Sequence, residues 1–229
     1  GREGLANVKT DLLHYQVRLV SEQAVPEGAA DVSAQVLAAR RSGAKVLVVW
    51  ARATTVASVL RAVRSTGWDV KVVTGPTGED PLVRQRLADH PTWVDGLVFV
   101  SFRITSEVGG APFAAYRKAY ESEYGPDLVG VKAQGKDVVM PPDWSMYSYD
   151  AVHLVKAALD RAGSTDRAKV LDALQHVTIT GANGDERGFG PDDREGVSPD
   201  DMYFATFTAM RFHPNHDDKL STNLPEVPQ

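Results

Sequence analysis

The stretch VLVVWARATTVASVLRAVRSTGWDVKVVTGPTG, residues Val46 to Gly78, decides the fold. It opens with an apolar run, Val46 to Trp50, which is too short for an independent helix and suits a strand buried on both faces. A helical pattern of apolar residues follows and ends at Gly67, and Val70 to Val73 form a second strand. The stretch therefore predicts a β-α-β unit.

Two polar side chains follow the strands of this unit. Arg52 comes just after the first strand, and Thr77 comes just after the second. In open α/β sheets, ligands bind beyond the carboxyl ends of the strands, so we expect both side chains to face a ligand. Between them, Thr54 or Thr55 offers a hydroxyl that we expect to cap the helix.

The alternation of strands and helices continues on both sides of this unit. Apolar runs predict further strands at residues 17–20 and 97–101. Apolar spacing and capping residues predict helices at residues 5–15, 31–43 and 80–88. Strands that alternate with helices imply a parallel sheet with right-handed crossovers. A last strand, Met202 to Met210, is expected to join or flank this sheet.

The pattern changes after Phe102. Three helices are predicted, at residues 112–124, 143–162 and 166–174, with no convincing strand between Phe102 and Leu174. Residues 125–140 look irregular, residues 180–199 form a loop or hairpin, and the tail from His213 is expected to be weakly ordered. Helices without a sheet of their own must cover another sheet, so we expect them to present an apolar face.

Composition excludes several classes of protein. The 229 residues carry a net charge of −5, which does not favour nucleic-acid binding, and no apolar run is long enough to span a membrane. There is no cysteine, hence no disulfide or thiolate metal site, and we expect no cofactor. We find no nucleophile–base pair, so we do not predict an enzyme. The abrupt start at Gly1 suggests a piece of a longer chain.

Several spaced motifs carry a resemblance to a known family. They lie in order along nearly the whole chain and are Pro26-x-Gly28-x-x-Asp31-x-Ser33-x-Gln35-Val36, Gly43-Ala44-Lys45-Val46, Leu60-Arg61-x-x-Arg64-x-x-Gly67, Tyr149-Asp150-Ala151-Val152, Ala162-Gly163-Ser164 and Gly188-Phe189. With these motifs the chain resembles the C-terminal portion of a type I periplasmic binding protein. The class it resembles is the branched-chain amino-acid (Leu/Ile/Val) ABC-transporter substrate-binding class.

The resemblance implies an α/β fold of two lobes with a ligand between them, a parallel-sheet sandwich in which one lobe is largely complete. Residues 1–102 would form this second lobe, and residues 103–180 would be helices that represent the first lobe. Residues 181–229 would form a hinge crossover, a strand that returns to the second lobe and a polar tail. The first lobe's own strands would belong to a missing N-terminal segment of the same protein.

The family's binding site carries over only in part. Its amino-acid-binding members place a Tyr at the position of Arg52 and a Glu, which holds the ligand's ammonium group, at the position of Thr77. A guanidinium suits a carboxylate, so we expect a small polar or acidic solute. The alternative is that Arg52 is a surface residue that pairs with a nearby acidic side chain.

Four more residues are candidates for the ligand site. Trp144 matches an aromatic position against the ligand in the family, with packing at the hinge as the alternative. Trp50 belongs either to the core or to the pocket wall, and Phe102 and Arg103 end a strand at the inferred hinge.

The resemblance implies a binding protein that captures a small-molecule solute and presents it to an ABC permease in the membrane. Such a protein works in the periplasm or outside the cell, with a lipid anchor on a segment outside this chain as a further option. Its mechanism is hinge closure around the ligand. The alternative is a sensory or regulatory ligand-binding domain of the same fold.

Overall fold

The stretch from Val46 to Gly78 folds as the β-α-β unit that its sequence predicts. In the computed structural model, β1 (Val46–Val49) pairs in parallel with β2 (Lys71–Thr74), and α3 (Ala53–Ser65) connects them. The structure describes residues 2–102, 106–194, 196 and 202–219. Beyond β2, a parallel pairing continues to β3 (Val98–Phe102), which confirms the predicted strand near residues 97–101.

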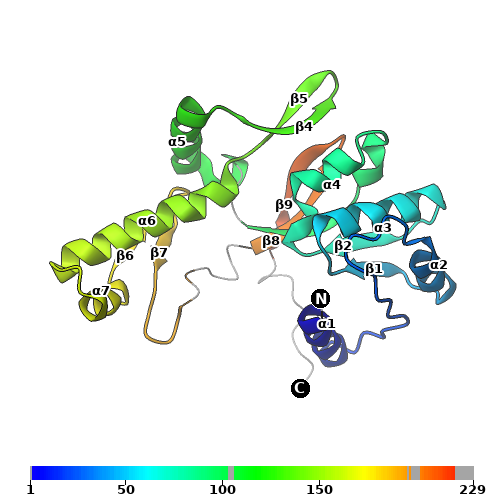
Figure 1. The fold of residues 1–229 in the computed structure, drawn as a ribbon, viewed down its shortest axis with the longest axis horizontal. Coiled ribbons are helices and arrows are strands. Elements are labelled where there is room, and N and C mark those ends of the chain that lie inside the picture. The colour runs from blue at the N-terminus through cyan, green and yellow to red at the C-terminus, as the bar shows by residue number, and fades with distance from the viewer. Residues whose placement is uncertain (1, 103–105, 195, 197–201, 220–229) are drawn as a thin grey trace. The chain divides into compact units, whose positions relative to one another are not determined.

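The described residues belong to two compact units. Unit 1 consists of Gly1–Ser101, Leu128–Val138 and Tyr203–Gln229, and unit 2 of Phe102–Asp127 and Val139–Met202. Unit 1 contains a sheet with the strand order β1-β2-β3-β8-β9 (Figure 1). In this sheet, β8 is Met202–Thr208 and β9 is Arg211–Lys219. The other elements of unit 1 are α1 (Arg2–His14), α2 (Ser33–Arg41), the short helix η1 (Pro76–Gly78), α4 (Pro81–Arg86), η2 (Pro91–Val94), and most of the hairpin β4 (Asp127–Ala133) and β5 (Lys136–Met140).

Strand register assigns the apolar side chains to two faces of the sheet. Val49 lies opposite Thr74, and Thr74 lies opposite Phe99, so these three share one face, which is buried. The face is covered by helices, since η1 packs on Thr74 and Phe99 and α3 packs against both η1 and α4. On the opposite face Val46 and Val48 are 50% and 49% exposed.

A buried arginine joins α4 to the antiparallel strands β8 and β9. Arg84 is 2% exposed, and its Nη1 donates a hydrogen bond of 3.1 Å to the Met210 carbonyl in the turn between these strands. Its guanidinium lies 4.6 Å from the ring centre of Phe207, which packs on Phe99. Arg84 therefore ties a helix to the centre of the sheet through a charge-assisted hydrogen bond and a cation–π contact.

Unit 2 is built from helices and one small hairpin. Its elements are α5 (Ser106–Tyr124), α6 (Asp143–Ala162), α7 (Arg167–Leu174), β6 (Thr178–Thr180) and β7 (Glu186–Gly188). Asp166 caps α7 by accepting from the Lys169 N–H, and Gly163 ends α6 in the left-handed conformation, as glycine can without strain. All three helices were predicted from sequence, although α5 begins earlier than expected and contains Pro112.

The strand predicted at residues 17–20 is wrong for this structure. These residues form no strand, and their side chains are exposed. The cause is local: α1 ends with Gln16 in the left-handed conformation, and the Val17 N–H donates to the Leu12 carbonyl. This helix-ending motif uses the Val17 N–H, which is therefore not available to a neighbouring strand.

Sequence reasoning also missed the hairpin β4–β5 in the stretch judged irregular. Its two-residue turn, Gln134-Gly135, has positive φ at both positions, as a tight hairpin requires. The missed signal was the alternation of buried Val129 and Val131 with polar or small residues. Gln85 of α4 donates a 2.6 Å hydrogen bond to the Val129 carbonyl, which holds the hairpin on unit 1.

Two further expectations are corrected. Arg52 occupies the N-cap of α3 without a side-chain hydrogen bond, so neither Thr54 nor Thr55 caps this helix. The chain from His213, which was expected to be a weakly ordered tail, continues β9 as far as Lys219. Pairing with β8 satisfies its backbone groups, and propensity alone does not reveal this.

Replacing Arg84 with alanine should lower the free energy of unfolding by about 2–4 kcal/mol, because it removes a buried charge-assisted hydrogen bond and leaves a cavity. Urea unfolding followed by circular dichroism measures this loss. Arg86→Ala, at an exposed position of the same helix, is the control and should change stability by less than about 0.5 kcal/mol. Equal effects of the two substitutions would contradict the role given to Arg84.

Candidate functional site

The loops after β1 and β2 meet at the carboxyl edge of the sheet in unit 1. The Thr77 hydroxyl donates a 2.9 Å hydrogen bond to the carbonyl of Ala51, the residue before Arg52. It also lies 3.5 Å from the hydroxyl of Thr74 at the end of β2. The structure therefore brings the backbone of the Arg52 loop and the Thr77 side chain together, as parallel pairing of the two strands requires.

The Arg52 side chain is exposed and forms an ion pair with an acidic side chain. Its Nε lies 2.7 Å from Oε1 of Glu27, and both side chains are mostly exposed to solvent. The pair matches the alternative given in the sequence analysis, a surface arginine that pairs with a nearby acidic side chain, and the acid is Glu27 from the loop that precedes α2. An exposed ion pair contributes about 0–1 kcal/mol to stability, so the pair leaves Arg52 available for other contacts.

A buried carboxylate lies behind this edge, and sequence reasoning missed it. Glu79 is 2% exposed, and its Oε2 accepts a 2.8 Å hydrogen bond from the hydroxyl of Ser101, a buried residue in β3. The contact joins the turn that carries Thr77 to the third parallel strand. In the sequence, Ser101 directly follows an apolar run and Glu79 lies in the polar turn after β2, and neither position reveals that the two side chains pair.

The other predicted site residues are placed as follows. Trp50 is 52% exposed, and its indole lies beside Gly75 and close to Gly4 of α1, so it belongs to the edge of unit 1. Phe102 is the last residue of β3, and Arg103 lies outside the described residues. Trp144 lies in the first turn of α6 in unit 2 and is exposed.

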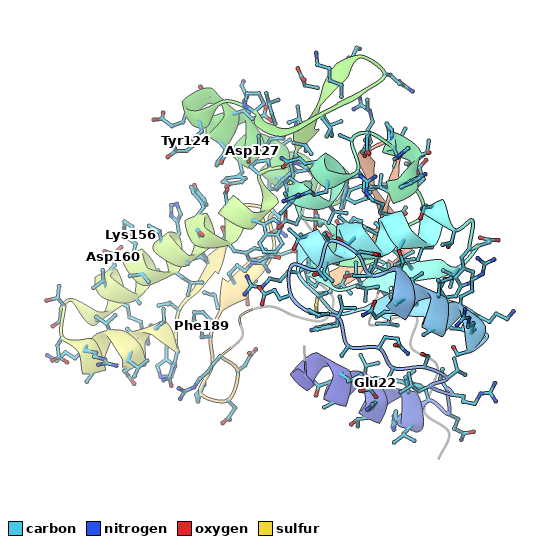
Figure 2. All side chains as sticks on the ribbon, turned by 45° about the vertical axis from the view of Figure 1, so that its right-hand side comes forward. Glu22, Tyr124, Asp127, Lys156, Asp160 and Phe189 are labelled. Carbon is cyan, nitrogen blue, oxygen red and sulfur yellow. The ribbon has the colours of Figure 1, made fainter. Side chains whose placement is uncertain are left out.

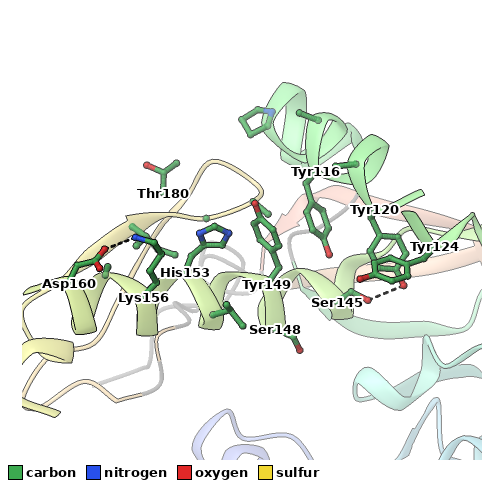
Figure 3. A pocket seen from close by; sticks show the side chains of 18 residues that line it. Tyr116, Tyr120, Tyr124, Ser145, Ser148, Tyr149, His153, Lys156, Asp160 and Thr180 are labelled. Atoms are coloured by element: carbon green, nitrogen blue, oxygen red, sulfur yellow. Dashed lines mark hydrogen bonds and ion pairs between the residues drawn. The ribbon is translucent and has the colours of Figure 1, made fainter. Parts of the chain in front are cut away.

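Unit 2 has an open groove of about 1090 Å³ between α5, α6 and the residues that follow β6 (Figure 3). Tyrosines line much of it, and the Ser145 hydroxyl donates to the Tyr120 hydroxyl at 3.5 Å. Tyr149 and Val152 lie in its wall and are 47% and 70% exposed. The expectation that α6 presents an apolar face is therefore confirmed. Lys156 and Asp160, labelled in Figure 2, also line the groove and form an exposed ion pair with each other.

The opposite side of α6 is buried and contains an ion pair. Arg187 of β7 has its Nε 3.6 Å from Oδ2 of Asp150, and each side chain is 5% exposed. Oδ1 of Asp150 accepts a 2.8 Å hydrogen bond from the Ala182 N–H. Burial raises the pKa of Asp150 above its usual range, and the backbone hydrogen bond and Arg187 only partly oppose this.

The groove itself affects one tyrosine. Partial burial among the neighbouring rings, together with nearby Tyr120, raises the pKa of Tyr116 to about 12. Tyr116 therefore stays protonated at any physiological pH and offers its hydroxyl as a hydrogen-bond donor.

Within the described part of the chain, no cluster of three or more histidine or acidic side chains is arranged to hold a metal ion. None of the helices in that part is both long and apolar enough to cross a membrane.

Comparison with known proteins gives a consistent result. The family model described as periplasmic binding protein matches residues 1–211. No curated protein matches the sequence. Among solved structures, the fold is similar to a type 1 periplasmic binding protein from Bordetella pertussis, with a TM-score of 0.77 and 18% identity over 93% of this chain. It is also similar to the leucine-binding protein LivK of Thermotoga maritima, with a TM-score of 0.71 and 19% identity over 93% of this chain.

A third similar structure is the branched-chain amino-acid binding protein LivJ of Streptococcus pneumoniae in complex with isoleucine, with a TM-score of 0.68 and 18% identity over 90% of this chain. The chain spans only 53–58% of the length of these three proteins. At such identity the likeness shows the fold, a parallel-sheet α/β architecture of the type I periplasmic binding protein kind.

The raised pKa of Asp150 predicts a pH dependence of stability. The native state holds the proton of Asp150 to higher pH than the unfolded state, where the pKa is about 3.9. As pH rises from about 4 through the raised folded-state pKa, the unfolding free energy of the wild type should therefore fall relative to that of Asp150→Asn. Urea unfolding at a series of pH values measures the difference. Asp160→Asn, an exposed site on the same helix, should leave the profile unchanged, and parallel profiles for wild type and Asp150→Asn would refute the prediction.

Proposed function

The chain belongs to the periplasmic binding protein family, and from this premise we propose that it is part of the solute-binding component of an ABC importer. It acts outside the cytoplasm, held there by a lipid anchor on a segment outside this chain, and delivers a small solute to a membrane permease. In this proposal residues 1–102 form the second lobe, residues 103–180 contribute helices to the first lobe, and residues 181–229 include the hinge crossover and the returning strand. It catalyses no reaction; ligand shifts an equilibrium between open and closed forms.

The solute that we propose is small and polar or acidic. The observation that supports this is the position of Arg52 and Thr77 on joined loops at the carboxyl edge of the sheet. Glu27 contacts Nε of Arg52, and the terminal amino groups of this guanidinium, for which the described residues show no partner, can donate a paired hydrogen bond to a carboxylate. Trp50, Phe102, Arg103 and Trp144 complete the proposed site.

The similar proteins named above suggest a second set of solutes to compare. The structures include a leucine-binding protein and a complex with isoleucine. Glu27 supplies the one acidic group close to Arg52 in the described residues, whereas the family's amino-acid binders carry a glutamate at the position of Thr77. An acidic solute needs the guanidinium alone, and an aliphatic amino acid needs an acidic partner for its ammonium group as well.

Arg52→Ala in the intact protein should weaken binding of an acidic solute by about 2–5 kcal/mol, because it removes a charge-assisted pair in a closing cleft. Calorimetry against dicarboxylates, amides, leucine, isoleucine and valine measures the change. Arg61→Ala is the control, since Arg61 forms a comparable exposed pair with Asp89 elsewhere in unit 1 and should leave affinity unchanged. Unchanged affinity in Arg52→Ala, or a cationic best solute, would show that Arg52 is only a surface residue.

We further propose that the groove of unit 2 packs against the N-terminal segment of the intact protein that this chain lacks. Two observations support this. The groove presents apolar side chains of α5 and α6, and the chain spans little more than half of the similar structures. An uncovered apolar face of this kind favours association.

The isolated chain should therefore self-associate, and Val152→Lys should shift it toward the monomer because it places a charge in the groove. Sedimentation velocity over a range of concentrations measures the change. Leu128→Lys, which alters an exposed apolar residue of β4 outside the groove, is the control and should not. A wild-type chain that is monomeric at all concentrations would contradict the proposed covering of the groove.

A further inference from the structure

Three loops that meet at the carboxyl edge of unit 1 carry much more acid than base. They are residues 21–32 before α2, residues 50–52 after β1 and residues 75–80 after β2. Arg52 is the one basic residue in these three loops. Arg103 lies outside the described residues and is not part of them. The acidic residues of the three loops are Glu22, Glu27, Asp31, Glu79 and Asp80.

Glu27 is the acidic residue that contacts Arg52, and a turn of the backbone holds it in place. The other four acidic residues of these loops contact other groups. The Ala29 N–H donates a 3.2 Å hydrogen bond to the Pro26 carbonyl, so the chain turns at Glu27. Gly28 has a φ of 74°, which glycine adopts without strain. The Glu27 carboxylate is therefore presented to Arg52 by a defined turn.

The atoms of this contact determine how a solute can reach the guanidinium. Oε1 of Glu27 lies 2.7 Å from Nε of Arg52, which leaves the two terminal amino groups to form a paired hydrogen bond with another carboxylate. A solute carboxylate bound there lies close to that of Glu27. Two like charges about 5 Å apart at an exposed site weaken binding about fourfold.

This repulsion has different consequences for the first and the second negative charge of a solute. The first carboxylate gains a charge-assisted pair with Arg52, which outweighs its repulsion from Glu27. A second carboxylate on the same small molecule finds no further cation in these three loops. It adds only repulsion from Glu27 and from the other acidic side chains of the edge.

We propose that Glu27 is a specificity-determining residue that restricts the proposed site to solutes with one negative charge. The proposal rests on the proposed function, in which Arg52 binds the solute. Glu27 neutralises part of the charge of Arg52, so the site retains enough attraction for one carboxylate and disfavours a second one. Of two acids of equal length, the site therefore prefers the monocarboxylate.

Butyrate and succinate test this preference, because they have the same number of carbon atoms and differ by one carboxylate. Calorimetry with the intact protein should show tighter binding of butyrate. Glu27→Gln keeps an oxygen that can accept from Nε and removes the charge, so it should raise the affinity for succinate relative to butyrate about fourfold. Glu22→Gln, in the same loop but paired with Lys9, is the control and should leave this ratio unchanged (Figure 2).

The outcomes separate this inference from the proposed function. If Arg52→Ala leaves the binding of both acids unchanged, the proposed role of Arg52 fails. If Arg52→Ala weakens both and Glu27→Gln leaves their ratio unchanged, Arg52 binds the solute and only the role of Glu27 is wrong. A wild-type protein that prefers succinate would also overturn the role of Glu27.

Chemical modification of Arg52 gives a readout that needs no bound solute and decides the question even if neither acid binds. Phenylglyoxal is neutral, para-carboxyphenylglyoxal carries one negative charge, and both modify guanidinium groups. Peptide mass spectrometry of the whole chain measures the rate of each at Arg52. Glu27→Gln should raise the ratio of the anionic to the neutral rate about fourfold. The same ratio at Arg61, which pairs with Asp89, is the control and should not change. An unchanged ratio at Arg52 would overturn the proposal.

Discussion

The parallel register between β1, β2 and β3 is the constraint on which the rest of unit 1 depends. Because Val49, Thr74 and Phe99 lie side by side on one face, that face is continuous, and α3 and η1 cover it. The same register brings the ends of all three strands to one edge. There Thr77 bonds to the Ala51 carbonyl, and the buried Glu79 carboxylate accepts a hydrogen bond from buried Ser101 of β3, so the turn after β2 contacts both neighbouring strand ends.

Unit 2 depends on a different interaction, the contact of α6 with the hairpin β6–β7. One side of α6 buries Asp150 against Arg187 and the Ala182 N–H, and the other side forms the wall of the groove. A buried carboxylate is costly unless it is paired and hydrogen-bonded, and the raised pKa of Asp150 shows that its partners do not fully offset the loss of water. Because Arg187 and Ala182 lie in and next to the hairpin, these contacts of Asp150 link α6 to it.

The two surfaces differ in chemistry, and this difference supports the proposed roles. The edge of unit 1 offers charge and hydroxyl groups on loops, where small changes in sequence alter specificity without disturbing the sheet. The groove of unit 2 offers tyrosine rings and Val152, which suit the packing of another part of a protein better than the capture of a small polar solute. A binding protein needs both kinds of surface, one for its solute and one for its own assembly.

The sequence by itself determined the α/β class, the β-α-β unit of residues 46–78, and helix α6 with both its ends, because apolar periodicity and glycine positions are local signals. It also indicated that Arg52 and Thr77 share an edge. Only the tertiary structure decided that Glu27 pairs with Arg52, that Ser101 bonds to Glu79, that residues 125–140 form a hairpin on α4, and that residues 17–20 leave the sheet. The physical reason is that these features depend on pairing between distant segments or on competition between a local motif and a long-range ladder, and neither leaves a periodic pattern in the sequence.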